Sequence, residues 1–172
     1  EMIHIAEGKP LTYKQEDIKL SGFAIEFRIN AENPQNNFMP SIGTIKNYMA
    51  PGGPGVRLDS SAYAGYTIPP NYDSMVGKLI VYGNDWASTV KKASRALGEF
   101  HVDGVITNIS LHREIVKDED FISGNLTTNY LDKRMELFNL DVVDTNALEV
   151  QKIDEIKEMI EKIKSLKLTT RQ

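Results

Sequence analysis

The sequence predicts an α+β fold, in which a bent antiparallel sheet comes first along the chain and helices pack over it. The residues that break helices indicate this order, because all seven prolines lie at or before Pro70 and the last glycine is Gly124. The spacing of apolar residues agrees, since it changes from a period of two to a period of about 3.6. We therefore expect the sheet within residues 20–83 and helices from about residue 85 onward.

The first elements expected are a helix end and a strand. Residues 1–9 have the pattern of a helix that Gly8 closes in the left-handed conformation. The clearest strand covers residues 23–30, where apolar and other side chains alternate. One face carries Phe23, Ile25, Phe27 and Ile29. The other face brings together the polar side chains of Glu26, Arg28 and Asn30.

Turns and shorter strands fill the rest of the expected sheet. Strands are expected over residues 44–49 and 56–59, on either side of a tight loop at residues 50–55 that is rich in proline and glycine. A continuous apolar run at residues 79–81 predicts a buried strand over residues 76–82.

Three helices and a helical tail are expected after the sheet. Asn84 or Asp85 can cap the first helix. Its apolar residues recur at helical spacing, at Trp86, Val90, Ala93, Leu97 and Phe100. Thr107 or Asn108 can cap the second helix, and the third begins near Thr127. The tail carries four isoleucines at the spacing of a coiled-coil seam, at Ile153, Ile156, Ile160 and Ile163.

Composition narrows the class of protein. The chain has 172 residues and a net charge of −4, which argues against nucleic acid as the main partner. No run approaches the roughly 18 apolar residues of a membrane span, and the first residues lack the features of a signal peptide. Cysteine is absent and the three histidines are scattered, so thiolate catalysis, disulfides and a zinc site are not expected. We expect a soluble cytoplasmic protein with no metal site of its own.

Nucleotide-binding motifs are missing from the chain. It contains neither a P-loop nor the Gly-x-Gly-x-x-Gly fingerprint of dinucleotide-binding proteins. The glycine-rich loop at residues 50–55 superficially resembles a phosphate cradle. Pro54 interrupts it, however, and offers no N–H group, and a strand rather than a helix follows. A structural turn is the better interpretation.

Arg28 is the candidate functional residue. It is either an exposed strand arginine paired with a neighbouring carboxylate, or a guanidinium that binds an anion such as bicarbonate or an enolate. In the second case Glu26 and Asn30, on the same face, are placed to orient it. Arg57 is interpreted as part of a surface ion pair, and the histidines are given no role.

Arg28 lies in a segment that resembles a known family. Residues 22–34 resemble the G-H-A-I-E-x-R-I-N-A-E-D-P segment of biotin carboxylases, with Phe23 in place of the usual histidine and Asn33 in place of the usual aspartate. Further matching blocks follow in the family's order, at residues 38–41, 51–57, 63–66, 69–80, 104–108 and 121–131. Together the blocks cover about residues 1–135, and the chain is similar to the C-terminal domain of biotin carboxylase.

The resemblance implies three parts. Residues 1–20 correspond to the end of a preceding ATP-grasp domain and a linker, residues 21–135 to the half-barrel C-terminal domain, and residues 136–172 to a helical tail. The tail lies outside the core of the match and resembles the A subunits of two-subunit pyruvate carboxylases. Its apolar stripe packs either on its own domain or on a partner.

The resemblance also implies an activity and its site. Biotin carboxylases are ligases that use ATP and Mg²⁺ to activate bicarbonate and to carboxylate biotin held on a carrier protein. Arg28 then contacts bicarbonate and steadies the biotin enolate. Pro54 and Arg57 correspond to positions at a homodimer interface, and Thr128 to a neighbour of the adenine. The partner is a biotin carboxyl carrier or carboxyltransferase subunit, which selects the final acceptor, such as pyruvate or acetyl-CoA.

The chain alone is expected to be inactive. The glycine-rich lid of the ATP-grasp domain, the metal-binding carboxylates, the general base and a biotinylation site are all missing from its 172 residues. An alternative function is therefore a non-catalytic module that assembles the subunits of a biotin-dependent carboxylase complex. Such a module has no need of Arg28, so the match around this residue favours the ligase.

Overall fold

The computed structural model describes residues 1–140, and the predicted isoleucine stripe of the tail lies outside them. The strands are β1 (Phe23–Asn30), β2 (Glu32–Asn33), β3 (Met39–Pro40), β4 (Asn47–Met49), β5 (Val56–Asp59), β6 (Met75–Gly83) and β7 (His101–Asp103). The helices are α1 (Met2–Ala6), α2 (Trp86–Glu99), α3 (Ile109–Ile115), α4 (Glu119–Ser123) and α5 (Tyr130–Arg134). Short 3₁₀ turns occur at Gln15–Asp17, Pro34–Asn36 and Met135–Leu137.

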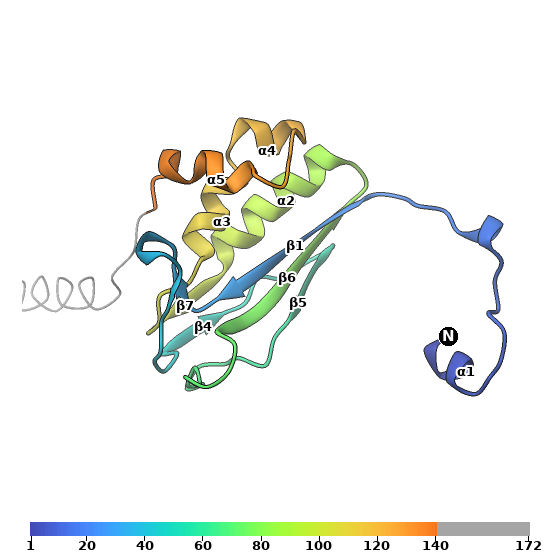
Figure 1. Ribbon diagram of the computed structural model, residues 1–172, viewed down its shortest axis with the longest axis horizontal. Helices are drawn as coiled ribbons and strands as arrows, with labels where there is room; N and C mark the ends of the chain where they lie inside the picture. Colours follow the sequence, from blue (N-terminus) through green and yellow to red (C-terminus); the bar gives the residue numbers. More distant parts are fainter. Residues whose placement is uncertain (141–172) are drawn as a thin grey trace, which may run out of the picture.

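Three antiparallel strands form the main sheet, in the order β1-β6-β5. β6 is the central strand, and its Leu79 lies opposite Phe27 of β1 on one side and Leu58 of β5 on the other. The helix α2 packs across β6 and β1, with α3 beside it, while β4 and β7 form a separate two-stranded ladder (Figure 1). The predicted α+β class is confirmed, and so is the antiparallel pairing of its strands.

The core forms between one face of the sheet and α2. The buried sheet residues follow the predicted alternation, and they include Phe27, Ile29, Leu79 and Val81. The helix covers them with its predicted apolar positions Val90, Ala93 and Leu97, and with Phe100 at its end. Burial of large side chains such as these contributes roughly 1.5–3 kcal/mol each. This packing turns the opposite face of the sheet, with its charged side chains, away from the helices.

Side-chain hydrogen bonds define both ends of α2. At its start Asp85 accepts a hydrogen bond from the backbone N–H of Ser88 at 2.8 Å, and this bond lowers the pKa of Asp85. At its other end the guanidinium of Arg113, from α3, donates to the carbonyl oxygens of Leu97 at 2.9 Å and Phe100 at 3.1 Å. Arg113 therefore ties α3 to the end of α2.

Two short elements differ from the sequence-based prediction. β7 follows α2, in the part of the chain expected to be helical, and pairs with β4. The helix α4 is capped by Asp118, whose Oδ1 accepts from the backbone N–H groups of Asp120 and Phe121. It ends at Gly124, which has a φ of 77°. Elements this short carry no periodic pattern, so spacing alone does not reveal them.

Residues 1–22 extend away from the sheet, and all of them are exposed (Figure 1). The helix α1 lies in this segment, and Gly8 just after it has a φ of 77°, which confirms the expected left-handed closure. Among residues 1–140, no helix has the length and apolar character needed to cross a membrane.

Candidate functional site

The face of the main sheet opposite α2 carries charged side chains from three strands. Strand pairing places Arg28 of β1 opposite Lys78 of β6, and Lys78 opposite Asp59 of β5. Two residues further along β6, Ile80 lies between Glu26 of β1 on one side and Arg57 of β5 on the other. Residues paired across strands point to the same side of a sheet. We call these five charged residues the charged face.

The Arg28 side chain is paired with Glu26 and otherwise faces solvent. Its Nε lies 3.5 Å from Oε1 of Glu26, and the two side chains are 65% and 43% exposed. An exposed pair of this kind contributes little stability. Lys78, across the strand pair from Arg28, adds a second positive charge to the same row of the sheet. The charged face therefore holds three cations against two carboxylates, and this excess of positive charge favours the binding of an anion.

Asn30 lies at the end of β1 and does not join Arg28. Its Nδ2 donates to Oε1 of Glu32 at 3.2 Å, and its Oδ1 is buried without a hydrogen-bond partner among residues 1–140. The strand pairing shifts register between Ile29 and Asn30, and the residue skipped in this shift is Val76 of β6. The contact expected between Asn30 and Arg28 is therefore not found, whereas the contact with Glu26 is.

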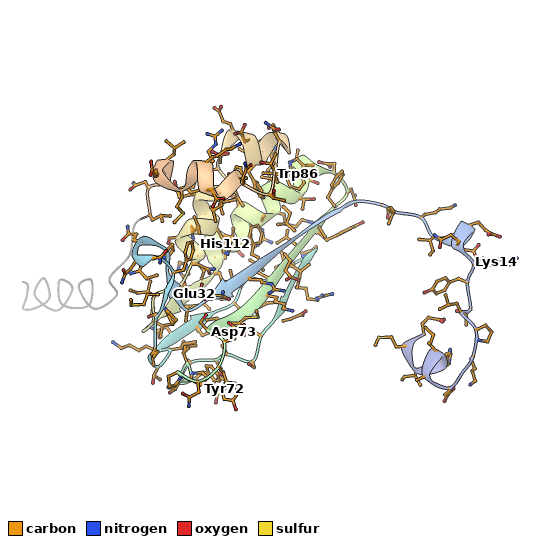
Figure 2. All side chains as sticks on the ribbon, in the orientation of Figure 1. Lys14, Glu32, Tyr72, Asp73, Trp86 and His112 are labelled. Carbon is orange, nitrogen blue, oxygen red and sulfur yellow. The ribbon has the colours of Figure 1, made fainter. Side chains whose placement is uncertain are left out.

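Two residues of the α3 region hold the backbone of β1 at Arg28. Oδ1 of Asn108 accepts from the N–H of Asn30 at 2.9 Å, and Nδ2 of Asn108 donates to the carbonyl of Arg28 at 3.0 Å. Nε2 of His112 contacts the same carbonyl at 3.1 Å, and its ring meets that of Phe27 edge-on. Figure 2 labels His112 where α3 faces β1.

These two residues were not recognised from the sequence as part of a site. Asn108 was considered as a helix cap, and it does precede α3, but its side chain makes no capping hydrogen bond to that helix. His112 is given no role by the sequence, and in the structure its ring bonds to the backbone of the candidate residue. An asparagine before a helix has the same local pattern whether it caps that helix or bonds to a distant strand, so only the tertiary fold separates the two.

Burial lowers the pKa of His112, and the hydrogen bond to the Arg28 carbonyl opposes this shift only in part. A carbonyl oxygen only accepts, so we assign the proton of the neutral ring to Nε2. Glu26 and Tyr130 are the other ionisable residues that line the pocket beside this ring. Burial, followed by the nearby Asp118, raises the pKa of Tyr130, which keeps its hydroxyl neutral.

The lowered pKa of His112 predicts loss of stability in mild acid. A histidine whose pKa is lower in the folded state stabilises the fold above its unfolded value of about 6.5, and this contribution disappears as the pH falls through the folded value. We expect the melting temperature of the protein to fall between pH 7.5 and pH 5. The melting temperature of the His112→Gln variant, whose side chain keeps a donor but does not titrate, is expected to fall less over the same range. Scanning calorimetry across this range measures both. Equal pH dependence of the melting temperature in the two proteins would show that His112 is not the source of this effect.

A cavity of about 290 Å³ lies beside β1, between that strand and the helices α3, α4 and α5. Most of its lining is apolar, from Ile25, Phe27, Ile115, Phe121, Leu126 and Leu131. Thr127 lines the cavity, whereas Thr128, the predicted neighbour of the adenine, lies in the exposed turn next to it. The position of Thr128 next to the adenine therefore stays a prediction, because Thr128 does not line this cavity.

Arg57 forms a surface ion pair on the charged face, as its sequence setting suggests. Its Nε lies 3.2 Å from Oδ1 of Asp59, and both side chains are more than half exposed. Pro54 is exposed in the preceding loop, which Arg95 of α2 holds by donating to the carbonyl of Gly52 at 3.1 Å. Both predicted interface residues are thus accessible on a loop and strand that are held in place.

The charged face carries donor groups that suit an anion. Among residues 1–140, no group of three or more histidine, aspartate or glutamate side chains is arranged to hold a metal ion. Arg28, in contrast, presents a planar fork of N–H donors whose geometry matches a carboxylate or a bicarbonate ion. The arrangement can bind and orient a small oxyanion.

Comparison with known proteins matches this part of the chain to one family. The family model of the biotin carboxylase C-terminal domain covers residues 26–133. Biotin carboxylase 1 of Bacillus subtilis is 51% identical over 132 residues, which cover 77% of this chain and 29% of that protein. The pyruvate carboxylase A subunit of Methanothermobacter thermautotrophicus is 41% identical over all 172 residues, which cover 34% of its length.

Solved structures show the same similarity. The biotin carboxylase domain dimer of the Hydrogenobacter thermophilus 2-oxoglutarate carboxylase, in complex with MgADP, ADP and bicarbonate, matches 80% of this chain with a TM-score of 0.77 and 46% identity. The biotin carboxylase subunit of pyruvate carboxylase matches with the same three values. In both cases the match covers 30% of the solved chain, so this chain spans about a third of the length of its relatives.

Proposed function

The chain belongs to the biotin carboxylase C-terminal domain family, and from this premise we propose that it is part of a biotin carboxylase subunit. That subunit is an ATP-dependent ligase that carboxylates carrier-bound biotin with bicarbonate. Relatives named biotin carboxylase match residues of this chain at 45–51% identity, and a related domain was solved with MgADP and bicarbonate. The observation within this chain that carries the proposal is the placement of Arg28 on the charged face, where it is paired with Glu26.

Arg28 supplies positive charge where the reaction needs it. Its N–H donors bind the bicarbonate anion and then stabilise the negative charge that the reaction develops on biotin. A cation held in advance at such a place is among the largest catalytic contributions in a site that excludes water. The Arg28 side chain is 65% exposed in this chain, and we propose that another part of the subunit covers it in the active enzyme. Glu26 orients the guanidinium through its Nε.

ATP and Mg²⁺ are bound mainly by parts of the subunit outside this chain. Among the described residues no cluster of metal-ligating side chains is present, and the chain has no phosphate-binding loop. We propose that the metal ligands and the general base belong to the ATP-grasp domain. Residues 1–172 alone are therefore proposed to be inactive, and no step of the reaction other than anion binding is assigned to them.

Pyruvate is the acceptor we propose for the carboxyl group. The match to the pyruvate carboxylase A subunit of Methanothermobacter thermautotrophicus extends over all 172 residues, whereas the biotin carboxylases in the comparison match 131–137 residues. The additional match includes the tail, which supports docking to a subunit that bears biotin and the carboxyltransferase. The acceptor itself is selected by that partner and not by the charged face.

A homodimer is proposed as the assembled form, with Pro54 and Arg57 at the interface. The support is twofold. Both residues are exposed on a loop and strand that neighbouring elements hold in place, and the related domain from Hydrogenobacter thermophilus was solved as a dimer.

Radiolabelled bicarbonate tests the proposed activity. The subunit that carries this chain is expected to fix labelled bicarbonate onto free biotin in a reaction that requires ATP, and residues 1–172 purified alone are expected to fix none. Omission of ATP is the control for chemical carboxylation. An intact subunit that binds its partner but fixes no label would favour the assembly module instead.

A further inference from the structure

We propose that Asn108 is a positioning residue for Arg28, and that His112 assists it through the same carbonyl. This inference rests on the proposed function, in which the Arg28 guanidinium binds bicarbonate. Both residues lie on the α3 side of β1, so they act on the guanidinium through the backbone of the strand.

The need for such a residue follows from the place of β1 in the sheet. Among the strands of residues 1–140, β1 lies at an edge of the main sheet and pairs with β6 along one side. On the other edge, the backbone groups of Arg28 and Asn30 require partners from elsewhere, because a buried and unpaired peptide group is costly. Asn108 supplies them, since its side chain accepts from Asn30 N–H at 2.9 Å and donates to the Arg28 carbonyl at 3.0 Å. Its backbone N–H also donates to the Asn30 carbonyl, at 3.1 Å. The side-chain amide takes the place of a peptide group on a neighbouring strand.

The residue that provides this contact is itself rigidly held. Asn108 is only 7% exposed, and the helix that follows buries Ile109 and Leu111. Arg113, on the same helix, bonds to the end of α2 at two carbonyls. The α3 region therefore offers a fixed reference point for β1.

The guanidinium of Arg28, in contrast, makes few contacts that hold it in place. Among residues 1–140 its ion pair is with Glu26, at 3.5 Å between exposed side chains. The location of the guanidinium therefore depends on the backbone from which the side chain extends. A displacement of about 1 Å in a catalytic group can lower the rate by on the order of 10²-fold. Loss of the Asn108 contacts is therefore expected to slow the reaction.

Steady-state kinetics of biotin carboxylation by the intact subunit test this role. Asn108→Ala is expected to lower kcat by about tenfold to a hundredfold while the KM for ATP is unchanged, since ATP is bound mainly elsewhere. Asp85→Ala is the matched control, because it removes the capping hydrogen bond at the start of α2 without touching β1 or α3. It is expected to lower the melting temperature but to keep kcat within about twofold of wild type. If Asn108→Ala fails to fold, Asn108→Asp gives the same test, because it keeps the acceptor for Asn30 and loses the donor to Arg28.

A double-mutant cycle separates positioning from general damage. In an Arg28→Ala background, Asn108→Ala is expected to lower kcat by less than about a further twofold, because the guanidinium that Asn108 positions is gone. The same loss in both backgrounds would overturn the proposal, and so would a wild-type rate for Asn108→Ala alone when Arg28→Ala is slow. A wild-type rate for Arg28→Ala is a different result, and it would contradict the proposed function itself.

Discussion

Replacement of Arg28 by alanine in the intact subunit is expected to slow carboxylation of biotin by about 10²–10³-fold, or about 2.7–4 kcal/mol of transition-state stabilisation. The reason is that the chain places this guanidinium on the charged face beside Lys78, where the reacting anions need a fixed positive charge. The fold is expected to be intact, because the exposed pair with Glu26 adds little stability. The rate of labelled bicarbonate fixation and the melting temperature measure the two effects.

Arg28→Lys distinguishes the shape of the group from its charge. Lysine keeps the positive charge but lacks the planar fork, so it is expected to restore little of the lost rate. Lys117→Ala is the matched control, since it removes an exposed cation that is paired with Glu114 on α3, away from the charged face. It is expected to leave the rate unchanged. An Arg28→Ala subunit that works within a few-fold of wild type would show that Arg28 is only a surface arginine.

Gly104→Ala is expected to have the largest effect on folding, with a loss of about 3 kcal/mol or more of stability. Gly104 has a φ of 96°, a conformation that residues with a Cβ avoid, and an added Cβ would collide with the Thr44 carbonyl and lie 2.9 Å from the backbone nitrogen of Lys46. That nitrogen donates to the Asp103 carbonyl at 2.7 Å, so the collision falls beside the ladder between β4 and β7.

Gly98 provides the matched control for this substitution. It lies in α2, and an added Cβ there meets no atom within 4 Å. Gly98→Ala is therefore expected to stabilise the protein by about 0.5–1 kcal/mol, because alanine favours the helix and restricts the unfolded chain. Urea denaturation monitored by circular dichroism measures both changes. Equal midpoints for Gly104→Ala and wild type would show that this turn has room for a side chain.

The long elements of the fold were predictable because each has a periodic pattern. β1 has the predicted bounds, and the apolar positions predicted for α2 are buried from Val90 onward. The buried run around Leu79 gives β6, which is one residue longer at each end than predicted. The three-residue β7 and the five-residue α4 were missed, because elements of this length depend on pairing and capping rather than on spacing.

The candidate site was predictable only in part. Alternation in β1 placed Arg28 and Glu26 on one exposed face, and the structure shows them in contact. Whether that arginine pairs with a carboxylate or binds an anion was not decided by the pattern, and the family resemblance favours the anion. The role of Asn108 arises from contacts between residues about 80 positions apart, which no local pattern contains. Asn30 was expected to orient Arg28, but its amide bonds to Glu32 instead, and strand alternation does not reveal this contact.

The most direct test of the central claim is a structure of the intact subunit with bicarbonate bound. We expect nitrogen atoms of the Arg28 guanidinium to lie about 2.7–2.9 Å from bicarbonate oxygens, the distance of a charge-assisted hydrogen bond. We also expect that the Arg28 carbonyl still accepts from Asn108, as it does in this chain at 3.0 Å. Bicarbonate held by other residues, with Arg28 paired only to Glu26 and facing solvent, would contradict the account.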